Sequence, residues 1–299
     1  MAARIGDLGQ SRRLTSTLLG TQNRMRADEQ AVASGKGAAS YARIADATGL
    51  LLRAKDTRQL KTTFIEHNER LTLRLQTTDA ALGDLIGLAE RARGLMVQRL
   101  NGAVGDSVPL DAEAATMLAS VAAKLNATYD GSYIFAGSRT ATPPVVLPPV
   151  PATSADPSLW YAGDTLRPSA RIDTGMEIEH GILASEPPFA ELIAALGAAG
   201  EAHVADDRAA LQAAMDQLSG ALDGLIDLRG NLGVKTSRLE SVSEAQRASV
   251  AYLDETISGI EDTDLPEVIS RLARDQASLE AAYLVTGRLT SLSLGDYLR

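Results

Sequence analysis

The sequence has no cysteine among its 299 residues. Disulfides, thiolate metal sites and cysteine nucleophiles are therefore excluded. Aromatic residues make up only 4% of the chain although hydrophobic residues make up 45%. Alanine and leucine supply most of the apolar content, which is typical of helices that pack on one another rather than of a large aromatic-rich core.

Long apolar runs are also missing. No window approaches 18 uninterrupted apolar residues, so we expect no membrane insertion. The first 20 residues have no continuous apolar segment, so we expect no Sec-type signal peptide, and secretion would need a route that does not read a cleaved signal. The formal net charge of −9 argues against nucleic acid as a partner.

Catalytic and metal-binding motifs are absent from the sequence as well. The three histidines, at positions 67, 180 and 203, lack ligand-like spacing, and no Walker loop, GxGxxG or GxSxG motif occurs. We interpret Tyr-Ala-Gly-Asp at 161–164 as a tight turn in which Gly163 has a positive φ and Asp164 bonds its own backbone. We therefore expect no enzyme activity, no catalytic residue, no cofactor and no metal.

The strongest periodic signal lies in the second half of the chain. From Leu211 to Ile260, mostly apolar residues recur at alternating steps of four and three. A 3.5-residue spacing kept this long predicts one long helix with a coiled-coil seam. Asp206 or Asp207 is its expected N-cap, which is a simpler interpretation of the two carboxylates than a metal pair.

A matching seam lies in the first half. Its positions are Leu71, Leu75, Thr78, Leu82, Leu85, Ala89, Ala92 and Met96. A further helix is predicted from Pro109 or Asp111 to about Asn126, after a polar turn at 101–107. Because a long helix cannot bury its apolar stripe alone, we expect the two halves of the chain to pack together as an elongated bundle.

Each end of the chain carries another amphipathic helix. The N-terminal one has Leu14, Leu18, Thr21, Met25 and Val32 on one face and precedes SGKGAAS at 34–40; the C-terminal one follows a capping box of Asp264 and Glu267 and has the stripe Leu265, Ile269, Leu272, Gln276, Leu279, Tyr283 and Thr286.

The charges of the two ends are opposite. Residues 1–26 hold five arginines and one aspartate, net +4, and residues 261–280 hold six acids and two arginines, net −4. Opposite charge favours pairing of the two helices, although salt screens it over about 8–10 Å. The alternative is two solvated faces whose charges never meet.

The centre of the chain differs from both halves. Nine of the eleven prolines lie between 143 and 188, and β-type runs at 132–135, 169–172 and 176–178 are bounded by glycines. We predict a small, loop-rich β insert. Because a segment of this size makes a marginal core alone, it should lean on the helices or on neighbouring copies.

This order of elements resembles the flagellin superfamily. Three motifs carry the resemblance: VASGKGAASYARIADATG at 32–49, YIFAGS at 133–138 followed by YAGD at 161–164, and TSLSLGDYLR at 290–299. The second and third are similar to the hook–filament junction family within that superfamily. The implied fold is mainly α: an elongated helical rod with paired terminal helices and a small β-rich insert.

The resemblance also implies domains and a function. The terminal assembly domain would comprise residues 1–35 and 264–299, the helical rod 36–134 and 190–263, and the insert 135–189. The chain would be an exported structural subunit of the bacterial flagellum, secreted through the flagellar type III apparatus and assembled helically as an adaptor at the hook–filament junction. Its partners would be copies of itself, a neighbouring hook-associated protein, filament flagellin and an export chaperone. The alternatives are a flagellin-type filament subunit and, in a different class, an intracellular coiled-coil scaffold.

Three groups of residues follow as candidates. Subunit assembly would use terminal-helix residues Leu14, Leu18, Met25, Val32, Ile269, Leu272, Leu279 and Tyr283. The chaperone would cover the C-terminal segment residues Leu289, Leu292, Leu294, Tyr297 and Leu298. The start and first turn of the insert would use Tyr133, Ile134, Phe135, Gly137, Tyr161, Gly163 and Asp164, with the first three anchoring the crossing against the helices.

Overall fold

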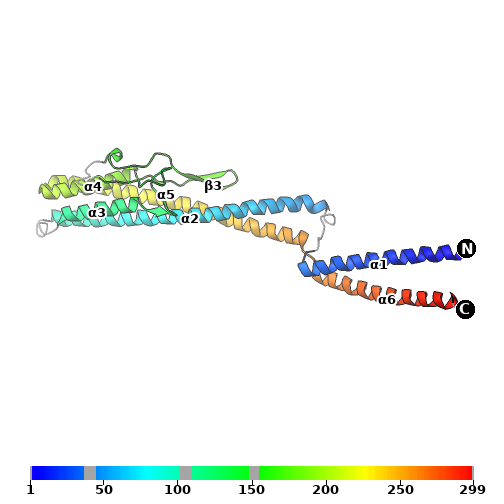
Figure 1. The fold of residues 1–299 in the computed structure, drawn as a ribbon. Helices are drawn as coiled ribbons and strands as arrows, with labels where there is room; N and C mark the ends of the chain where they lie inside the picture. Colours follow the sequence, from blue (N-terminus) through cyan, green and yellow to red (C-terminus); the bar gives the residue numbers. More distant parts are fainter. Residues whose placement is uncertain (1, 37–44, 102–108, 148–154, 298–299) are drawn as a thin grey trace. The chain divides into compact units, whose positions relative to one another are not determined.

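The computed structural model describes residues 2–36, 45–101, 109–147 and 155–297, and within them the side chains from residue 12 to 288 except 45 and 46. The helices of these ranges are α1 (Ala2–Ser34), α2 (Ala45–Leu100), α3 (Leu110–Leu125), α4 (Pro187–Val204), α5 (Arg208–Glu261) and α6 (Leu265–Tyr297) (Figure 1). The predicted fold class, mainly α with a bundle of long helices and a small β insert, is confirmed. None of the described helices has the length and apolar character that a membrane crossing needs.

The chain forms two compact units. The terminal unit comprises residues 1–60 and 249–299, and the bundle unit comprises residues 61–248. Helices α2 and α5 contribute to both units. The three-part division expected from the sequence stays a prediction.

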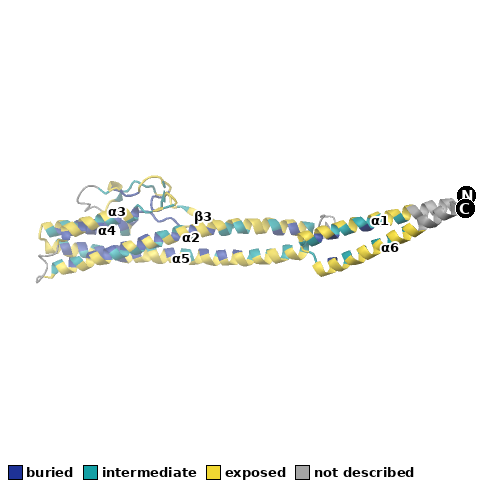
Figure 2. Cartoon of the chain, turned by 60° about the horizontal axis from the view of Figure 1, so that its bottom comes forward, coloured by how far each residue is buried: buried dark blue, intermediate teal, exposed yellow. Residues whose placement is uncertain are grey.

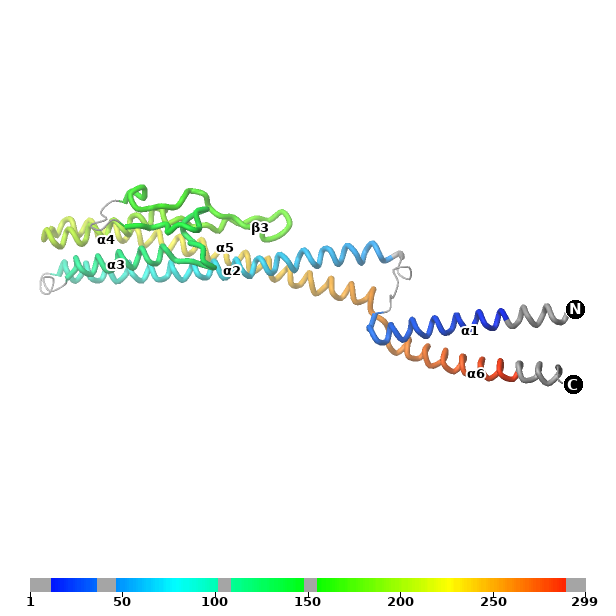
Figure 3. The backbone as a smooth tube through the Cα atoms, viewed as in Figure 1, coloured from blue at the N-terminus to red at the C-terminus, as the bar shows by residue number. Residues whose placement is uncertain are grey.

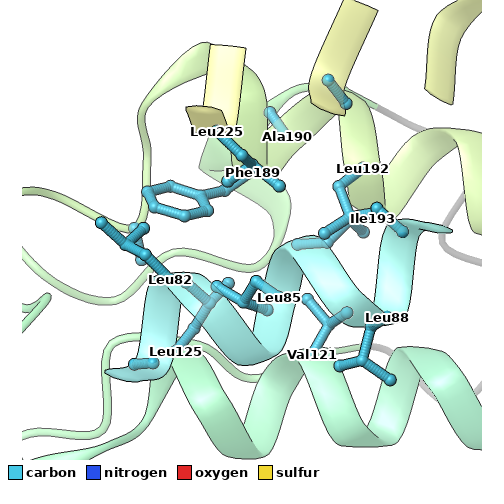
Figure 4. Close-up of a cluster of buried hydrophobic side chains, with 14 of the residues drawn as sticks. Leu82, Leu85, Leu88, Val121, Leu125, Phe189, Ala190, Leu192, Ile193 and Leu225 are labelled. Atoms are coloured by element: carbon cyan, nitrogen blue, oxygen red, sulfur yellow. The ribbon is translucent and has the colours of Figure 1, made fainter. Parts of the chain in front are cut away.

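The bundle unit is held together by one apolar core. Figure 4 shows its centre, where Leu82 and Leu85 of α2 meet side chains of α3, α4 and α5. All eight predicted seam positions of α2, from Leu71 to Met96, are buried. Each large apolar side chain buried in this way contributes about 1.5–3 kcal/mol. The seam predicted from the sequence is therefore confirmed in this helix.

The sequence placed 190–263 in the helical rod but did not predict α4 as a separate helix. Most positions from Phe189 to Ala202 are buried, so its alanine-rich sequence shows no single apolar stripe. Helix α4 ends at Val204 and α5 begins at Arg208, and Asp206 and Asp207 lie between them. Asp207 Oδ1 accepts hydrogen bonds from the N–H groups of Ala209 and Ala210 at 2.9 and 3.0 Å, so Asp207 is the N-cap of α5, as one of the two predicted options. The predicted limits of α3 are also confirmed.

The insert consists of two short hairpins and loops. Strands β1 (Thr128–Tyr129) and β2 (Ser132–Tyr133) pair antiparallel, as do β3 (Ser169–Asp173) and β4 (Met176–Glu179); a 3-10 turn, η3, covers Pro157–Leu159. The β run predicted at 132–135 is wrong in its second half. Figure 3 shows the chain leaving α3, crossing as the insert and returning into α4.

The described residues of the insert do not form a core of their own. Its residues Phe135, Trp160, Ile172 and Ile178 belong to the same buried cluster as the leucines of the bundle helices. Phe135 and Phe189 pack edge to face, with ring centroids 5.9 Å apart. The expectation that the insert leans on the helices is confirmed.

In the terminal unit, α1 and α6 lie side by side and antiparallel, so the start of α1 and the end of α6 are at the same end of the pair (Figure 1). Helix α1 ends at Gly35, which has a φ of +70° and donates its N–H to the carbonyl of Ala31 at 2.8 Å. Helix α6 begins after Asp264, whose Oδ1 accepts from the Glu267 N–H at 3.1 Å, as the predicted cap requires. Pairing of the terminal helices is confirmed, and the alternative of two unpaired solvated faces is wrong.

Candidate assembly surfaces

Ion pairs connect α1 to α6. Arg271 donates through Nε and Nη2 to the two carboxylate oxygens of Asp28, both at 2.9 Å, and Asp28 is only 4% exposed. Arg24 Nε lies 3.3 Å from Asp275 Oδ2. The Arg24–Asp275 pair follows the opposite net charges of the two ends, whereas the Asp28–Arg271 pair has the reverse polarity. Net charge therefore does not identify these four residues, since it does not say which side chains face each other.

The stripe of α6 that faces α1 differs from the predicted one. Its buried or half-buried positions are Val268, Arg271, Leu272, Asp275, Leu279, Ala282 and Thr286. The predicted Leu265, Ile269 and Tyr283 are exposed, at 39%, 52% and 51%. The predicted stripe is therefore wrong at these positions, and Arg271 and Asp275 face α1 instead.

The terminal unit leaves much apolar surface uncovered. Besides Ile269 and Tyr283, Leu284 and Val285 of α6 and Leu19 of α1 are more than half exposed. Figure 2 shows α6 as mostly exposed, in contrast to the buried faces of α2 and α4. Of the remaining candidate assembly residues, Leu14, Leu18, Met25, Val32, Leu272 and Leu279 are half-buried.

A shallow groove of about 360 Å³ runs between the two terminal helices. It is lined by Leu14, Leu18 and Thr21 of α1 and by Leu279 and Ala282 of α6, among others. Two of the candidate assembly residues of α1 therefore share one groove with one of α6.

The two chain breaks that delimit the terminal helices also lie together. Lys36 and Asp262 form an antiparallel β-bridge, and the Thr263 N–H donates to the Gly35 carbonyl at 3.0 Å. Glu261 pairs with Lys55 of α2 and, at 3.0 Å, with Lys36. Hydrogen bonds from the two lysines hold the pKa of Glu261 below its usual value. The segment 32–49 thus contributes Lys36 to a cluster of ion pairs with Glu261 and Lys55. Its residues 37–44 are outside the described part.

At the start of the insert, the predicted anchors lie against the helices. Ile134 and Phe135 are buried, and Tyr133 is half-buried. Gly137 has a φ of +69°, and a Cβ there would overlap Asp164 Oδ1 and approach the carbonyls of Asp164 and Leu166 to 2.9 and 3.0 Å. Only glycine fits this turn.

The YAGD segment closes onto this turn, and the predicted bond of Asp164 to its own nearby backbone is confirmed, whereas the predicted positive φ of Gly163 is wrong. Gly163 lacks a positive φ; it is needed because a Cβ would overlap the Tyr161 ring and lie 2.7 Å from the Ala136 carbonyl. Asp164 accepts from the Leu166 N–H at 3.2 Å and also from the N–H of Ser138 at 2.8 Å and its hydroxyl. Hydrogen bonds from Ser138 lower the pKa of Asp164. The two motifs therefore form one hydrogen-bonded unit, called the lock below, which joins residues 133–138 to residues 161–166. Within it the Tyr161 hydroxyl also donates to the Asp164 carbonyl at 2.7 Å.

A buried polar clamp holds the second hairpin on the bundle. The Ile172 carbonyl accepts from Asn68 Nδ2 at 3.0 Å and from Gln246 Nε2 at 2.8 Å, and both amides are fully buried. Lys61 Nζ donates to both oxygens of Asp173 at 2.7 and 2.8 Å. The polar seam position Gln246 was the only sequence signal for this clamp.

The three histidines have different environments. His180 is 8% exposed, and burial, together with the positive charges of Arg74 and Lys235, lowers its pKa to about 4. His203 Nδ1 accepts from Arg99 Nε at 2.8 Å, and the side chain of His67 is exposed. Within the described ranges, no group of three or more His, Asp or Glu residues is placed to hold a metal ion.

The C-terminal segment is only partly covered by the structure. Leu289, Leu292, Leu294 and Tyr297 belong to the backbone of α6, but their side chains are not among the described ones. Leu298 lies outside the described residues. The role predicted for these residues therefore stays a prediction.

Sequence comparison identifies one region of the chain. Residues 215–298, which span most of α5 and α6, match the family model of the bacterial flagellin C-terminal helical region. No curated protein sequence matches the chain significantly.

Solved structures share the fold at low sequence identity. FlgL from Bacillus cereus superposes with a TM-score of 0.57 at 20% identity, covering 70% of this chain and 99% of that one. A flagellar hook-associated protein from Vibrio parahaemolyticus gives a TM-score of 0.61 at 14% identity, with 74% and 100% coverage. Flagellar hook-associated protein 3 from Legionella pneumophila gives 0.55 at 12% identity, with 71% and 98% coverage. These similarities agree with the resemblance that the motifs indicated.

Proposed function

We propose that this chain, with its flagellin-type C-terminal helical region and the fold of the hook-associated proteins, is a structural subunit of the bacterial flagellum. It acts as an adaptor at the hook–filament junction, where copies assemble helically. Support comes from the family match at 215–298, from the three similar structures and from the paired terminal helices.

The exposed apolar surface of the terminal unit carries this proposal. Ile269, Tyr283, Leu284 and Val285 are each more than half exposed on one long helix. Isolated exposed apolar residues are common, but four of them on one helix that pairs with α1 mark an interaction surface. Ile269 and Tyr283 lie on one side of the helix, and Leu284 and Val285 follow Tyr283 at steps of about 100°, so further copies of this chain cover more than one side of α6 in the assembly. Leu14, Leu18, Met25, Val32, Leu272 and Leu279 then become fully buried as well.

The partners follow from the position at the junction. The terminal helices meet copies of the same chain, a neighbouring hook-associated protein and filament flagellin. The chain leaves the cell through the flagellar export apparatus, and an export chaperone covers Leu289, Leu292, Leu294, Tyr297 and Leu298 before secretion. The lock between 133–138 and 161–166 fixes the insert on the bundle as a structural element, and the protein is not an enzyme.

Immunogold labelling of isolated flagella tests the proposal. We expect label at the hook–filament boundary alone. Label along the whole filament would instead identify a filament subunit, and label restricted to the cell interior would favour an intracellular scaffold. The last two outcomes contradict the junction assignment.

A truncation tests the C-terminal segment separately. Deleting residues 289–299 should leave the melting temperature of the bundle unit unchanged, abolish chaperone binding and stop assembly at the hook, with filament subunits released into the medium. Replacing Ser291 and Ser293 by alanine is the matched control and should change none of these. Full-length filaments on cells that carry the truncated protein would contradict the assigned role of the segment.

A further inference from the structure

Helix α6 has two partly overlapping stripes that could pack against α1. The stripe that packs against α1 in the structure is the less apolar of the two. Both stripes include Leu272, Leu279 and Thr286. The packed stripe adds Val268, Arg271, Asp275 and Ala282, and the alternative stripe adds the exposed residues Leu265, Ile269, Gln276 and Tyr283. Burial of apolar area alone would favour the second stripe, since a fully buried leucine or isoleucine gains about 1.5–3 kcal/mol. Another interaction must therefore select the first.

The ion pair between Asp28 and Arg271 has the geometry to do so. Two parallel hydrogen bonds of 2.9 Å join the guanidinium to both oxygens of a carboxylate that is 4% exposed. Turning α6 by about 50°, the angle between the two stripes at 100° per residue, would carry Arg271 away from α1. Asp28 would then lose its pair with Arg271, and breaking a buried ion pair is strongly destabilising.

The same charges also select the register along the helices. In the antiparallel pair, Asp28 faces Arg271 and Arg24 faces Asp275. Sliding α6 by one turn, or about four residues, places Asp28 opposite either Glu267 or Asp275, and the first of these slips also brings Arg24 against Arg271. Like charges at such positions repel, so both neighbouring registers are disfavoured.

We propose that the Asp28–Arg271 pair, supported by Arg24–Asp275, determines which face of α6 meets α1. It thereby determines which face, with Ile269 and Tyr283, is left for neighbouring copies. Only this second consequence rests on the proposed function. The pair is a specificity element: it sets rotation and register, whereas the apolar residues supply the area to be buried.

Disulfide cross-linking of the purified full-length chain tests the proposal, because the natural sequence contains no cysteine. Thr21→Cys with Leu279→Cys joins two residues that line the same groove and reports the observed face. Thr21→Cys with Gln276→Cys reports the alternative face. In the otherwise unchanged chain we expect the first pair to cross-link about tenfold faster than the second, since disulfides form only between closely placed Cβ atoms.

Replacing both charges should remove this preference. With Asp28→Asn and Arg271→Gln, which leave no unpaired buried charge, we expect the two rates to become similar. The reversed pair, Asp28→Arg with Arg271→Asp, should restore much of the preference. Glu69→Gln with Arg247→Gln, a half-exposed ion pair of 3.0 Å within the bundle unit, is the control and should leave the preference unchanged.

Two results would overturn the proposal: an undiminished preference in the neutral background, or no preference in the unchanged chain. The melting temperature of the bundle unit, measured in each variant, shows that the chain is folded. Since the purified chain is used, these results do not depend on flagellar location. Absence of the protein from the junction would refute the proposed function and leave the cross-linking result standing.

Discussion

The bundle unit and the terminal unit use similar amphipathic helices in different ways. In the bundle unit, four helices surround one core, and the whole predicted seam of α2 is buried. In α1 and α6, the buried residues among the described side chains are Thr21, Asp28, Ala31 and Val268. The leucines and isoleucines of this pair whose side chains are described are half-buried or exposed.

The difference lies in the number of partners that each helix has. A helix in a four-helix arrangement is covered on a wide face, whereas a helix with one partner is covered along a narrow seam. The bundle unit is therefore stabilised by apolar burial within one chain. The terminal unit is oriented mainly by charges and keeps apolar residues available for other chains. Mutations of the same type should have different effects in the two units.

Truncation of a core leucine should give the largest difference. Leu225→Ala, at a fully buried position of α5, should lower the free energy of unfolding of the bundle unit by about 2–5 kcal/mol. Leu18→Ala, at a half-buried position of α1, should cost less than about 1 kcal/mol in the purified chain, because its methyl groups already contact water. Urea unfolding followed by circular dichroism measures both.

The contrast would fail if the two variants lost equal stability. Equal losses would mean that α1 is packed as tightly as the bundle helices in the isolated chain, which contradicts the exposed surface on which the assembly proposal rests.

Acidification should weaken the bundle unit before the terminal unit. The pKa of His180 is about 4 in the folded chain and about 6.5 when unfolded, so the unfolded state binds the proton first. This contribution to stability is complete above pH 6.5 and is lost as the pH falls toward 4, by on the order of 3 kcal/mol in total. Thermal melts between pH 7 and 4.5 measure it, above the range in which most carboxylates titrate.

Substitution of the histidine separates this effect from others. His180→Leu should flatten the pH dependence in that window, and His67→Gln, which removes only one of the smaller charges that lower the pKa of His180, should change it little. A slope that survives in His180→Leu would show that another group is responsible.

The sequence predicted the two units unequally well for a physical reason. Where many residues point to one core, as from Leu71 to Met96 and from Leu211 to Leu239, periodicity is enough to identify the buried face. In α6 the apolar positions form a stripe wider than one partner covers, so periodicity could not say that Ile269 and Tyr283 would stay exposed. Residues 190–204 were placed in the rod, but α4 was not predicted as a separate helix, because burial of most of its positions weakens the periodicity.

The candidate residues at the insert show the same limit. Gly137 could be predicted to allow a turn, since glycine accepts a positive φ. The role of Gly163 could not, because it depends on the Tyr161 ring and the Ala136 carbonyl, which approach it only in the folded chain. The hydrogen bonds from Ser138 to Asp164 and from Asn68 to Ile172 likewise join residues far apart in sequence, and no local pattern encodes them.

Glycine substitutions should give an intermediate contrast. Gly137→Ala combines a φ of +69° with overlap against Asp164, and should cost the bundle unit about 2–3 kcal/mol. Gly35→Ala has almost the same φ, +70°, but open space around it, and should cost about 1 kcal/mol, confined to the terminal unit. Hydrogen exchange read separately in α1 and in α3 distinguishes the two. An equal cost at both glycines would mean that backbone strain alone matters and that the lock with Asp164 contributes little.

The smallest expected effect concerns single ion pairs near the surface, and it is also the most specific to the terminal unit. Arg24→Gln removes the 3.3 Å pair with Asp275, and Arg247→Gln removes the 3.0 Å pair with Glu69; both arginines are at least half exposed. Such pairs contribute about 0.2–1 kcal/mol, so neither change should lower the melting temperature of the bundle unit measurably. In the terminal unit, however, few buried apolar groups stabilise the α1–α6 pair, so a single ion pair is a larger part of its stability. Amide exchange in α1 and α6 should therefore accelerate by up to about fivefold in Arg24→Gln and stay unchanged in Arg247→Gln.

Raising the salt concentration to 1 M, where the Debye length is about 3 Å, should reproduce the Arg24→Gln effect in the unchanged chain and add little in the variant. If exchange in α1 and α6 ignores both the substitution and the salt, charge does not orient the terminal pair, and the distinction between a unit held by apolar burial and one arranged by ion pairs is lost.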